Sequence, residues 1–306
     1  LFLPMKYSEH TANRKFIFKG WLLLLTVVTS LNLMAQVPDK GDELDMLLDE
    51  LFFNEQQFVD DILDSFVPYN FIYVNLSFEN NTYFTGRDPG VDQFNLVPQL
   101  SYYHSSGFNA SVSGIYYEEY TPHWDFTSVY LGYFKNLGKN QSFGFEGGYT
   151  RYFYSDGWDV FTNALNVGVG LRNKKRTLGT KLSGTFLFGT DEAFQLISRT
   201  YGRILIARRE NFVLKLRPQL NFIIAQQTIE LERLDPDTND PTGEFEYDDV
   251  FGLLNTQINL PIALATRSWD FEVGYNINFP NPVESEPNLD PTSYFHISIG
   301  YLIDLN

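Results

Sequence analysis

The sequence predicts an all-β fold: a transmembrane, antiparallel, up-and-down β-barrel of twelve strands that begins near residue 69. Three observations predict it. From Phe71 onward, apolar and polar residues alternate with a period of two, as in strands with one face in lipid and one in water. Many of these segments reach the roughly 9–11 residues that cross a bilayer. The connections between them alternate between short and long, as in outer-membrane barrels.

The composition agrees with such a barrel and excludes other classes. Aromatic residues make up 17% of the 306 residues, and the mean hydropathy of -0.21 is too low for a helical membrane protein. The absence of Cys excludes disulfides, thiolate metal sites and a lipidated N-terminal Cys. A formal net charge of -16 makes a nucleic-acid-binding surface improbable.

Residues 1–35 have the features of a secretory signal peptide. Basic residues precede an apolar run from Trp21 to about Met34, and the small residue Ala35 stands at a plausible cleavage point. The alternative is a single anchor helix, but the run is shorter than the ~20 residues that a span needs. We therefore expect a signal peptide over 1–35, a helical segment within 36–68, and the barrel over 69–306.

An acidic amphipathic helix is predicted over residues 42–66. Its apolar residues recur at helical spacing, and Asp and Glu fill the other face without Lys or Arg. The candidate plug or docking residues on the apolar face are Leu44, Leu47, Leu48, Leu51, Phe58 and Ile62. Three locations fit: inside or against the periplasmic mouth of the barrel, on a periplasmic partner, or on the membrane surface. The acidic face disfavours the last, because surface helices are usually basic.

The strand count comes from the alternation and from the connections. The expected strands are 70–84, 93–105, 108–120, 125–137, 142–154, 158–173, 176–189, 194–208, 211–232, 248–266, 269–280 and 292–305. Residues 85–92, 121–124, 155–157, 190–193, 233–247 and 281–291 form the longer or more acidic loops. An even count places both barrel ends on the short-turn, periplasmic side, where a signal-bearing N-terminus must lie. Ten or fourteen strands remain alternatives.

The last strand carries a motif of its own. Ile299, Gly300, Tyr301, Ile303 and Leu305 resemble the C-terminal signal that the barrel-assembly machinery reads, with Leu305 in place of the usual aromatic residue. As a whole, residues 36–306 resemble the outer-membrane β-barrels common in Bacteroidetes, which are Gram-negative. This resemblance implies a location in the outer membrane, with assembly machinery as a partner during biogenesis, but implies no activity.

Charged residues on the polar face of the strands define the candidate lumen. The strands from 176 to 232 contribute a basic arc: Lys181, Arg199, Arg203, Lys215 and Arg217. The acidic candidates are Glu79, Glu146, Asp270 and Glu272. Opposite charges that pair across a narrow interior are one interpretation, and an anion-selective arc is a second. A third joins the acidic helix to the basic arc as a plug.

The sequence offers little support for an enzyme or a metal site. The pair His104 and Ser105 falls in a short turn without an orienting acid, so we expect no catalytic residues. Asp235, Asp237, Asn239 and Glu246 have a calcium-loop spacing, but the Gly required at position six is Asp240. We therefore expect no cofactor, with calcium only as a weak candidate.

The predicted function is an outer-membrane, porin-like channel for small polar solutes. The alternative is a non-conducting structural or accessory barrel of a secretion or assembly complex, which docks an outer-membrane or periplasmic protein through its N-terminal helix or its loops. The expected partners are the lipid bilayer and the assembly machinery, with no nucleic acid.

Overall fold

A computed structural model describes residues 70–83, 86–88, 92–137, 142–155, 161–234, 241–266, 268–282 and 288–305. The strands are β1 (Asn70–Glu79), β2 (Asn95–His104), β3 (Phe108–Tyr117), β4 (Trp124–Leu137), β5 (Phe143–Tyr154), β6 (Asn163–Arg172), β7 (Leu178–Phe188), β8 (Glu192–Gly202), β9 (Ile204–Arg209), β10 (Phe212–Leu216), β11 (Gln219–Leu234), β12 (Pro241–Asn259), β13 (Ile262–Ala265), β14 (Trp269–Pro280) and β15 (Thr292–Asp304). Over this part of the chain, no helix is long and apolar enough to cross a membrane.

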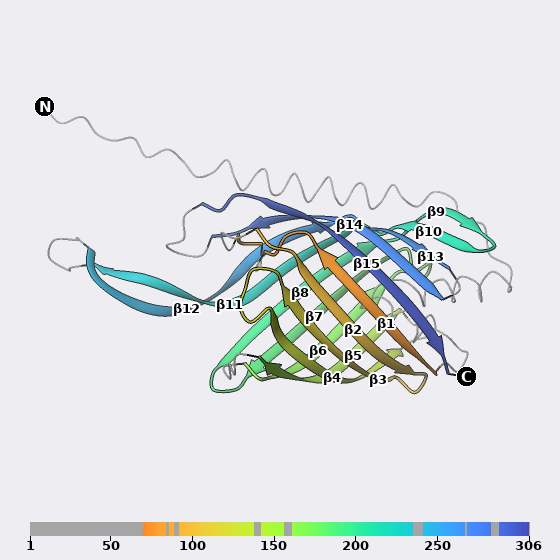
Figure 1. The fold of residues 1–306 in the computed structure, drawn as a ribbon, viewed down its shortest axis with the longest axis horizontal. Helices are drawn as coiled ribbons and strands as arrows, with labels where there is room; N and C mark the ends of the chain where they lie inside the picture. Colours follow the sequence, from red (N-terminus) through yellow and green to blue (C-terminus); the bar gives the residue numbers. More distant parts are fainter. Residues whose placement is uncertain are drawn as a thin grey trace, which may run out of the picture. The chain divides into compact units, whose positions relative to one another are not determined.

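The strands form one closed antiparallel sheet, shown in Figure 1. From β1 to β8 each strand pairs with the next, β8 pairs with β11, β9 with β10, β10 with β13, β11 with β12, both β12 and β13 with β14, and β14 with β15, which pairs with β1 to close the barrel. The segments β8 and β9, β10 and β11, and β12 and β13 each form a single pass through the wall. The barrel therefore has twelve strands, as the alternation and the parity of the connections predict.

Two prolines account for interruptions in the wall. Pro218 lies between β10 and β11, and Pro261 lies between β12 and β13. Proline has no backbone N–H to donate to a sheet ladder. Both still accept, because Gly202 donates its N–H to Pro218 O over 2.8 Å and Arg217 donates to Pro261 O over 3.0 Å. The wall is thus continuous, although part of its ladder is missing.

The expected loop over 233–247 is wrong. β11 reaches Leu234, β12 begins at Pro241, and the two remain paired from Gln219 opposite Asn259 to Leu234 opposite Pro241. Pro, Gly and acidic residues indicated a loop, but the backbone continues as a two-stranded ribbon. Figure 1 shows this ribbon extending beyond the ends of the other strands.

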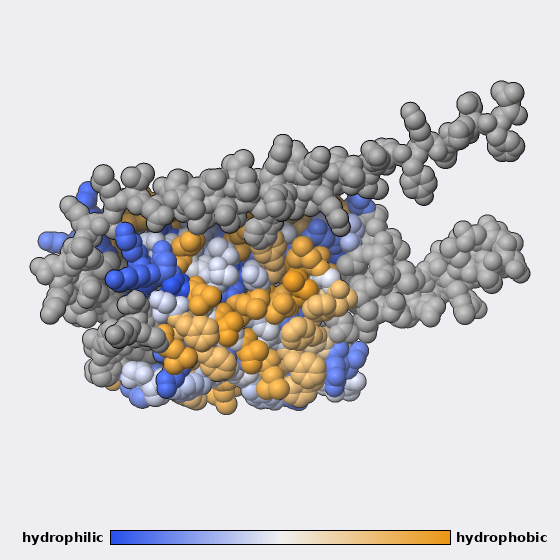
Figure 2. Space-filling model, turned by 180° about the vertical axis from the view of Figure 1, so that it is seen from behind, coloured by the Kyte–Doolittle hydropathy of each residue, from blue (hydrophilic) through white to orange (hydrophobic). Residues whose placement is uncertain are grey.

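The outward face is apolar, as the alternation predicts. On β1, Val74 and Leu76 are 41% and 47% exposed, whereas Asn75 between them is 6% exposed and points into the barrel. Figure 2 shows apolar side chains over the middle of the visible face and polar ones toward both ends. Exposed aromatic residues lie near both ends of the strands: Trp124, Phe153 and Phe279 near the long loops, and Tyr133, Phe143, Trp269 and Tyr301 near the short turns. Such belts are typical of membrane barrels.

A β-bulge changes one predicted orientation. The register of β11 and β12 shifts between Ile223 and Ile224, so that two residues of one strand face one of the other. As a result, Leu253 is 38% exposed, whereas Leu254, which a period of two counted back from Ile258 and Leu260 places on the outward face, is 2% exposed. A strict period of two cannot anticipate this extra residue.

The signal peptide and the helix over 42–66 lie outside the described residues. The domain boundaries at 35 and 68 therefore stay predictions.

Candidate functional site

An ion pair on the inner wall joins β5 to β7. Lys181 Nζ lies 2.6 Å from Glu146 Oε2, and the two side chains are 10% and 21% exposed. The strand between them, β6, presents Gly168 opposite Glu146 and Gly170 opposite Lys181. A Cβ on Gly168 would lie 2.6 Å from Glu146 Oε1. The ion pair therefore depends on glycine in the intervening strand.

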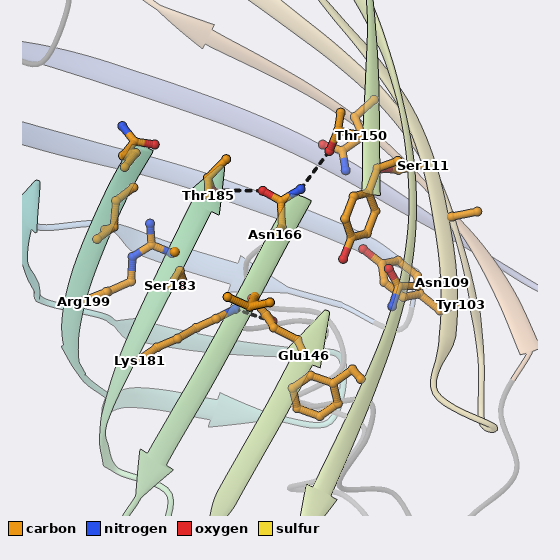
Figure 3. A pocket seen from close by; sticks show the side chains of 18 residues that line it. Tyr103, Asn109, Ser111, Glu146, Thr150, Asn166, Lys181, Ser183, Thr185 and Arg199 are labelled. Atoms are coloured by element: carbon orange, nitrogen blue, oxygen red, sulfur yellow. Dashed lines mark hydrogen bonds and ion pairs between the residues drawn. The ribbon is translucent and has the colours of Figure 1, made fainter. Parts of the chain in front are cut away.

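Neutral polar side chains continue the inner wall above this pair. Asn166 donates its amide to Thr150 Oγ1 over 3.0 Å, and Thr185 Oγ1 donates to Asn166 Oδ1 over 3.0 Å. Figure 3 shows this chain of hydrogen bonds across β5, β6 and β7. Arg199 on β8 donates its Nε–H to Asn221 Oδ1 over 3.2 Å. Side-chain hydrogen bonds thus link β5, β6 and β7 in one set and β8 and β11 in another.

These groups line a cavity of about 400 Å³ within the barrel. Its other wall carries Tyr103, Asn109 and Ser111 from β2 and β3, and Tyr130 and Phe134 from β4. The lining combines hydroxyl and amide groups, two cations, one carboxylate and aromatic rings. Such a lining can solvate a small polar solute by hydrogen bonds while the aromatic faces contact its apolar parts.

A second charged cluster lies on the opposite part of the wall. Arg217 Nη1 is 3.6 Å from Glu272 Oε2, and His296 Nε2 is 2.9 Å from Glu272 Oε1. Asn276 lies with its amide nitrogen 2.9 Å from His296 Nδ1, which fits the tautomer that carries its proton on Nε2. Tyr73 donates its hydroxyl to Asp270 over 3.0 Å. Densely packed polar groups therefore fill this part of the lumen.

The structure divides the predicted basic arc. Lys181 and Arg199 line the cavity, whereas Arg217 belongs to the second cluster. Lys215, 7% exposed, faces inward on β10. Arg203 lies between β8 and β9 and donates its backbone N–H to Thr177 O over 2.9 Å. The basic residues thus form no single continuous surface.

The acidic candidates also separate. Glu146 lies at the cavity, and Asp270 and Glu272 lie in the second cluster. Glu79 accepts a hydrogen bond from Asn95 over 2.8 Å at the long-loop end of β1. The pairs Lys181 with Glu146 and Arg217 with Glu272 match the interpretation in which opposite charges pair inside the barrel.

Sequence reasoning missed the neutral part of the site. The alternation places Thr150 and Asn166 on the inward set of β5 and β6, yet only charged residues were selected as candidates. Tyr130 was missed as well. Its ring covers the paired glycines Gly132 and Gly148, and this pair of inward glycines beside an aromatic residue was the available signal.

Other candidates remain untested or lie apart from the cavity. The helix residues Leu44, Leu47, Leu48, Leu51, Phe58 and Ile62 and the calcium candidates Asp235, Asp237 and Asn239 lie outside the described residues. Glu246 is described only by its place in β12. Among the described residues, no group of three or more His, Asp or Glu side chains is placed to hold a metal ion.

His104 and its neighbours form part of an exposed turn. His104 Nδ1 lies 2.9 Å from Ser106 Oγ and 3.2 Å from the Ser106 backbone nitrogen. The contact is thus with Ser106, not with Ser105, the neighbour considered from the sequence. This local turn contact stabilises the connection between β2 and β3.

Of three comparisons with known proteins, one, with solved structures, finds similar chains. No protein-family model matches the sequence, and no curated protein matches it. Among solved structures, the chain is similar to the COG4313 outer membrane channel from Pseudomonas putida F1, with 9% identity, a TM-score of 0.46, and coverage of 79% of this chain and 98% of that one. It is also similar to the KdgM porin (9% identity, TM-score 0.42, coverage 76% and 98%) and to the NanC porin (11%, 0.42, 75% and 98%). At these identities and scores, the similarity concerns the arrangement of strands alone.

Proposed function

We propose that the protein is a porin-like channel of the outer membrane that passes small polar solutes. The observation that carries this proposal is the polar cavity of about 400 Å³ inside a closed barrel whose outer face is apolar. A cavity with hydrogen-bonding walls can hold a polar solute that the surrounding lipid would exclude. The proposal includes periplasmic termini, because β1 begins and β15 ends on the side of the short turns.

The cavity is suited to solutes that exchange hydrogen bonds with water. Asn166, Thr150 and Thr185 can each redirect hydrogen bonds to a ligand, and Arg199 and Lys181 add positive charge beside the Glu146 carboxylate. Selection by charge then depends on the balance between Lys181 and Glu146. The proposal assigns no catalytic residue.

The first test is passage of solutes through the full chain. Proteoliposomes that contain the folded barrel should swell in isotonic solutions of small sugars and amino acids, and the rate should fall as the solute becomes larger. Heat-dependent migration on a gel verifies that the barrel is folded. Swelling no faster than that of protein-free liposomes would contradict the proposal.

The second test concerns the charged residues of the cavity. Glu146→Gln should shift the reversal potential in a KCl gradient toward anions, and Lys181→Gln should shift it toward cations. A change of one unit charge near the path is worth ~1 kcal/mol in water, on the order of fivefold in the permeability ratio. Lys135→Gln is the matched control, because Lys135 is exposed on the outward face of β4. Equal reversal potentials in all four proteins would exclude this cavity as the path.

A further inference from the structure

The two ends of the barrel carry opposite charge. In the described part of the chain, the basic residues at the short-turn end are Lys135, Arg172, Lys174, Lys175, Arg176, Arg203, Arg208 and Arg209, against the acidic Glu210, Asp270 and Asp304. At the long-loop end, leaving aside the ribbon of β11 and β12, the described acidic residues are Glu79, Asp88, Asp92, Glu118, Glu119, Asp125, Asp191, Glu192 and Asp290, against the basic Arg87 and Arg151. Lys174, Lys175 and Arg209 are exposed. We call the basic residues at the short-turn end the basic rim.

The polarity of the inward-facing side chains changes along the barrel. At the short-turn end, Phe71, Val213 and Ala265 point inward and are 3%, 5% and 3% exposed, so little of their surface is open to a partner. Leu205 lies opposite Lys215 on the inward face of β9 and is 54% exposed. Toward the long loops, the inward residues are polar, as in Asn95. Among these inward apolar side chains, the exposed Leu205 is therefore the one that can contact an apolar partner.

A segment of this chain has the matching chemistry. Residues 45–66 contain apolar residues at helical spacing, among them Leu47, Leu51, Phe58 and Ile62. The acidic residues of this segment are Asp45, Asp49, Glu50, Glu55, Asp60, Asp61 and Asp64, and it contains no Lys or Arg. A partner with one acidic face and one apolar face complements both the basic rim and the exposed Leu205.

The short connection to β1 and the length of residues 45–66 also allow this segment to reach the short-turn end of the barrel. β1 begins at Asn70 on the short-turn end, so residues 67–69 tether the segment within roughly 14 Å of that end. As a helix, residues 45–66 would be about 33 Å long. A barrel of twelve tilted strands has a diameter of about 24 Å. The tethered segment is therefore long enough to cross the mouth and reach the rim on the opposite side.

We propose that residues 45–66 dock into the short-turn end of the barrel, with their carboxylates on the basic rim and their apolar face on the exposed side chain of Leu205. The competing occupants of this end are anionic lipid on the rim and the same segment of a second copy. This inference concerns a docking surface and does not depend on the passage of solutes.

The test measures the mobility of the segment on the intact chain. The chain has no Cys, so Glu55→Cys provides a single site for a spin label. The labelled full chain is placed in phosphatidylcholine nanodiscs, one copy per disc. The rim variant combines Lys174→Glu, Lys175→Glu and Arg209→Glu. The matched control combines Glu118→Lys, Glu119→Lys and Glu192→Lys at the other end, where all three residues are exposed.

We expect an immobilised label in the parent and in the control, and a mobile label in the rim variant. Raising NaCl to 1 M should also increase mobility, because the Debye length falls to about 3 Å. Heat-dependent gel migration verifies a folded barrel for each protein. A mobile label in the parent, or one unchanged by the rim variant, overturns the proposal.

Two further outcomes identify another occupant. If the parent label is mobile and the rim variant instead loses binding to phosphatidylglycerol vesicles, the rim binds anionic lipid, and the docking proposal is wrong. If the label is mobile in single-copy discs but immobilised in liposomes at high protein density, the segment docks on a second copy. That result also overturns docking within one chain.

Discussion

The inner wall depends on glycines that leave space for larger neighbours. Gly132 on β4 pairs with Gly148 on β5, and the phenol ring of Tyr130 lies over both. The Glu146 side chain occupies the space above Gly168 in the same way. Each large side chain packs against backbone where a Cβ would otherwise stand. Glycine thereby sets which side chains can reach the cavity, including the aromatic wall formed by Tyr130.

Gly148→Ala should destabilise the barrel by about 1–3 kcal/mol, the usual range for an inserted methyl group in a packed region. Its Cβ would lie 2.5 Å from Tyr130 Cζ, so the ring must move. The adjacent Gly147→Ala is the matched control, since its Cβ would meet only Asn166 O at 3.8 Å. Urea unfolding, monitored by tryptophan fluorescence, measures the free energy of unfolding of both variants. Equal loss of stability in the two variants would contradict a role for the Tyr130 contact.

For single residues, the sequence predicts which face of a strand a side chain lies on better than it predicts which other side chains it contacts. The period of two places Lys181 and Glu146 on the inner face, because orientation follows directly from alternation. Their contact depends on the register of β5, β6 and β7 and on the glycines between them, neither of which alternation specifies. The opposite orientation of Leu254 has a similar origin, because a bulge in register is invisible to a periodic pattern.

Among the elements, the ribbon of β11 and β12 differs from the rest of the wall. β8 pairs with β11 only as far as Ala225, and β14 pairs with β12 only from Asn255 onward. Beyond these residues, the two strands pair with each other alone. A two-stranded hairpin is at best marginally stable by itself, so this ribbon adds little to the stability of the barrel.

Replacing residues 229–248 with a two-residue Asn-Gly turn should therefore leave the barrel folded, with a midpoint of urea unfolding close to that of the parent. The turn would join Thr228 to Asp249, which are register partners. The comparison is a deeper deletion that joins Phe222 to Thr256 and removes Ile223, the partner of Ile197 on β8. Heat-dependent gel migration and urea titration report folding. Loss of the folded band in the shorter deletion would show that the ribbon is needed by the barrel.

Across the whole molecule, the sequence predicts the strand count because the count depends on local features. Strand length, alternation and the order of short and long connections each act over a few residues, and together they indicate twelve passes. The cavity depends instead on which inward residues of distant strands, such as Tyr103 and Lys181, meet across the lumen. The charge difference between the ends is readable from the sequence only after the ends are assigned.

A segment docked at the short-turn end of the barrel would also affect conduction. If residues 45–66 occupy the short-turn end, they obstruct the path through the lumen, and deletion of residues 36–68 should raise the single-channel conductance several-fold. A second variant replaces residues 45–66 with a Gly/Ser linker of equal length, which keeps the tether but removes the charges and the apolar face. Such a linker behaves as a flexible coil and cannot pack on the wall. Planar-bilayer recordings of the full chain, the deletion and the linker variant measure this directly. We expect both variants to conduct more than the full chain, and equal conductance in all three would show that the segment does not obstruct the channel.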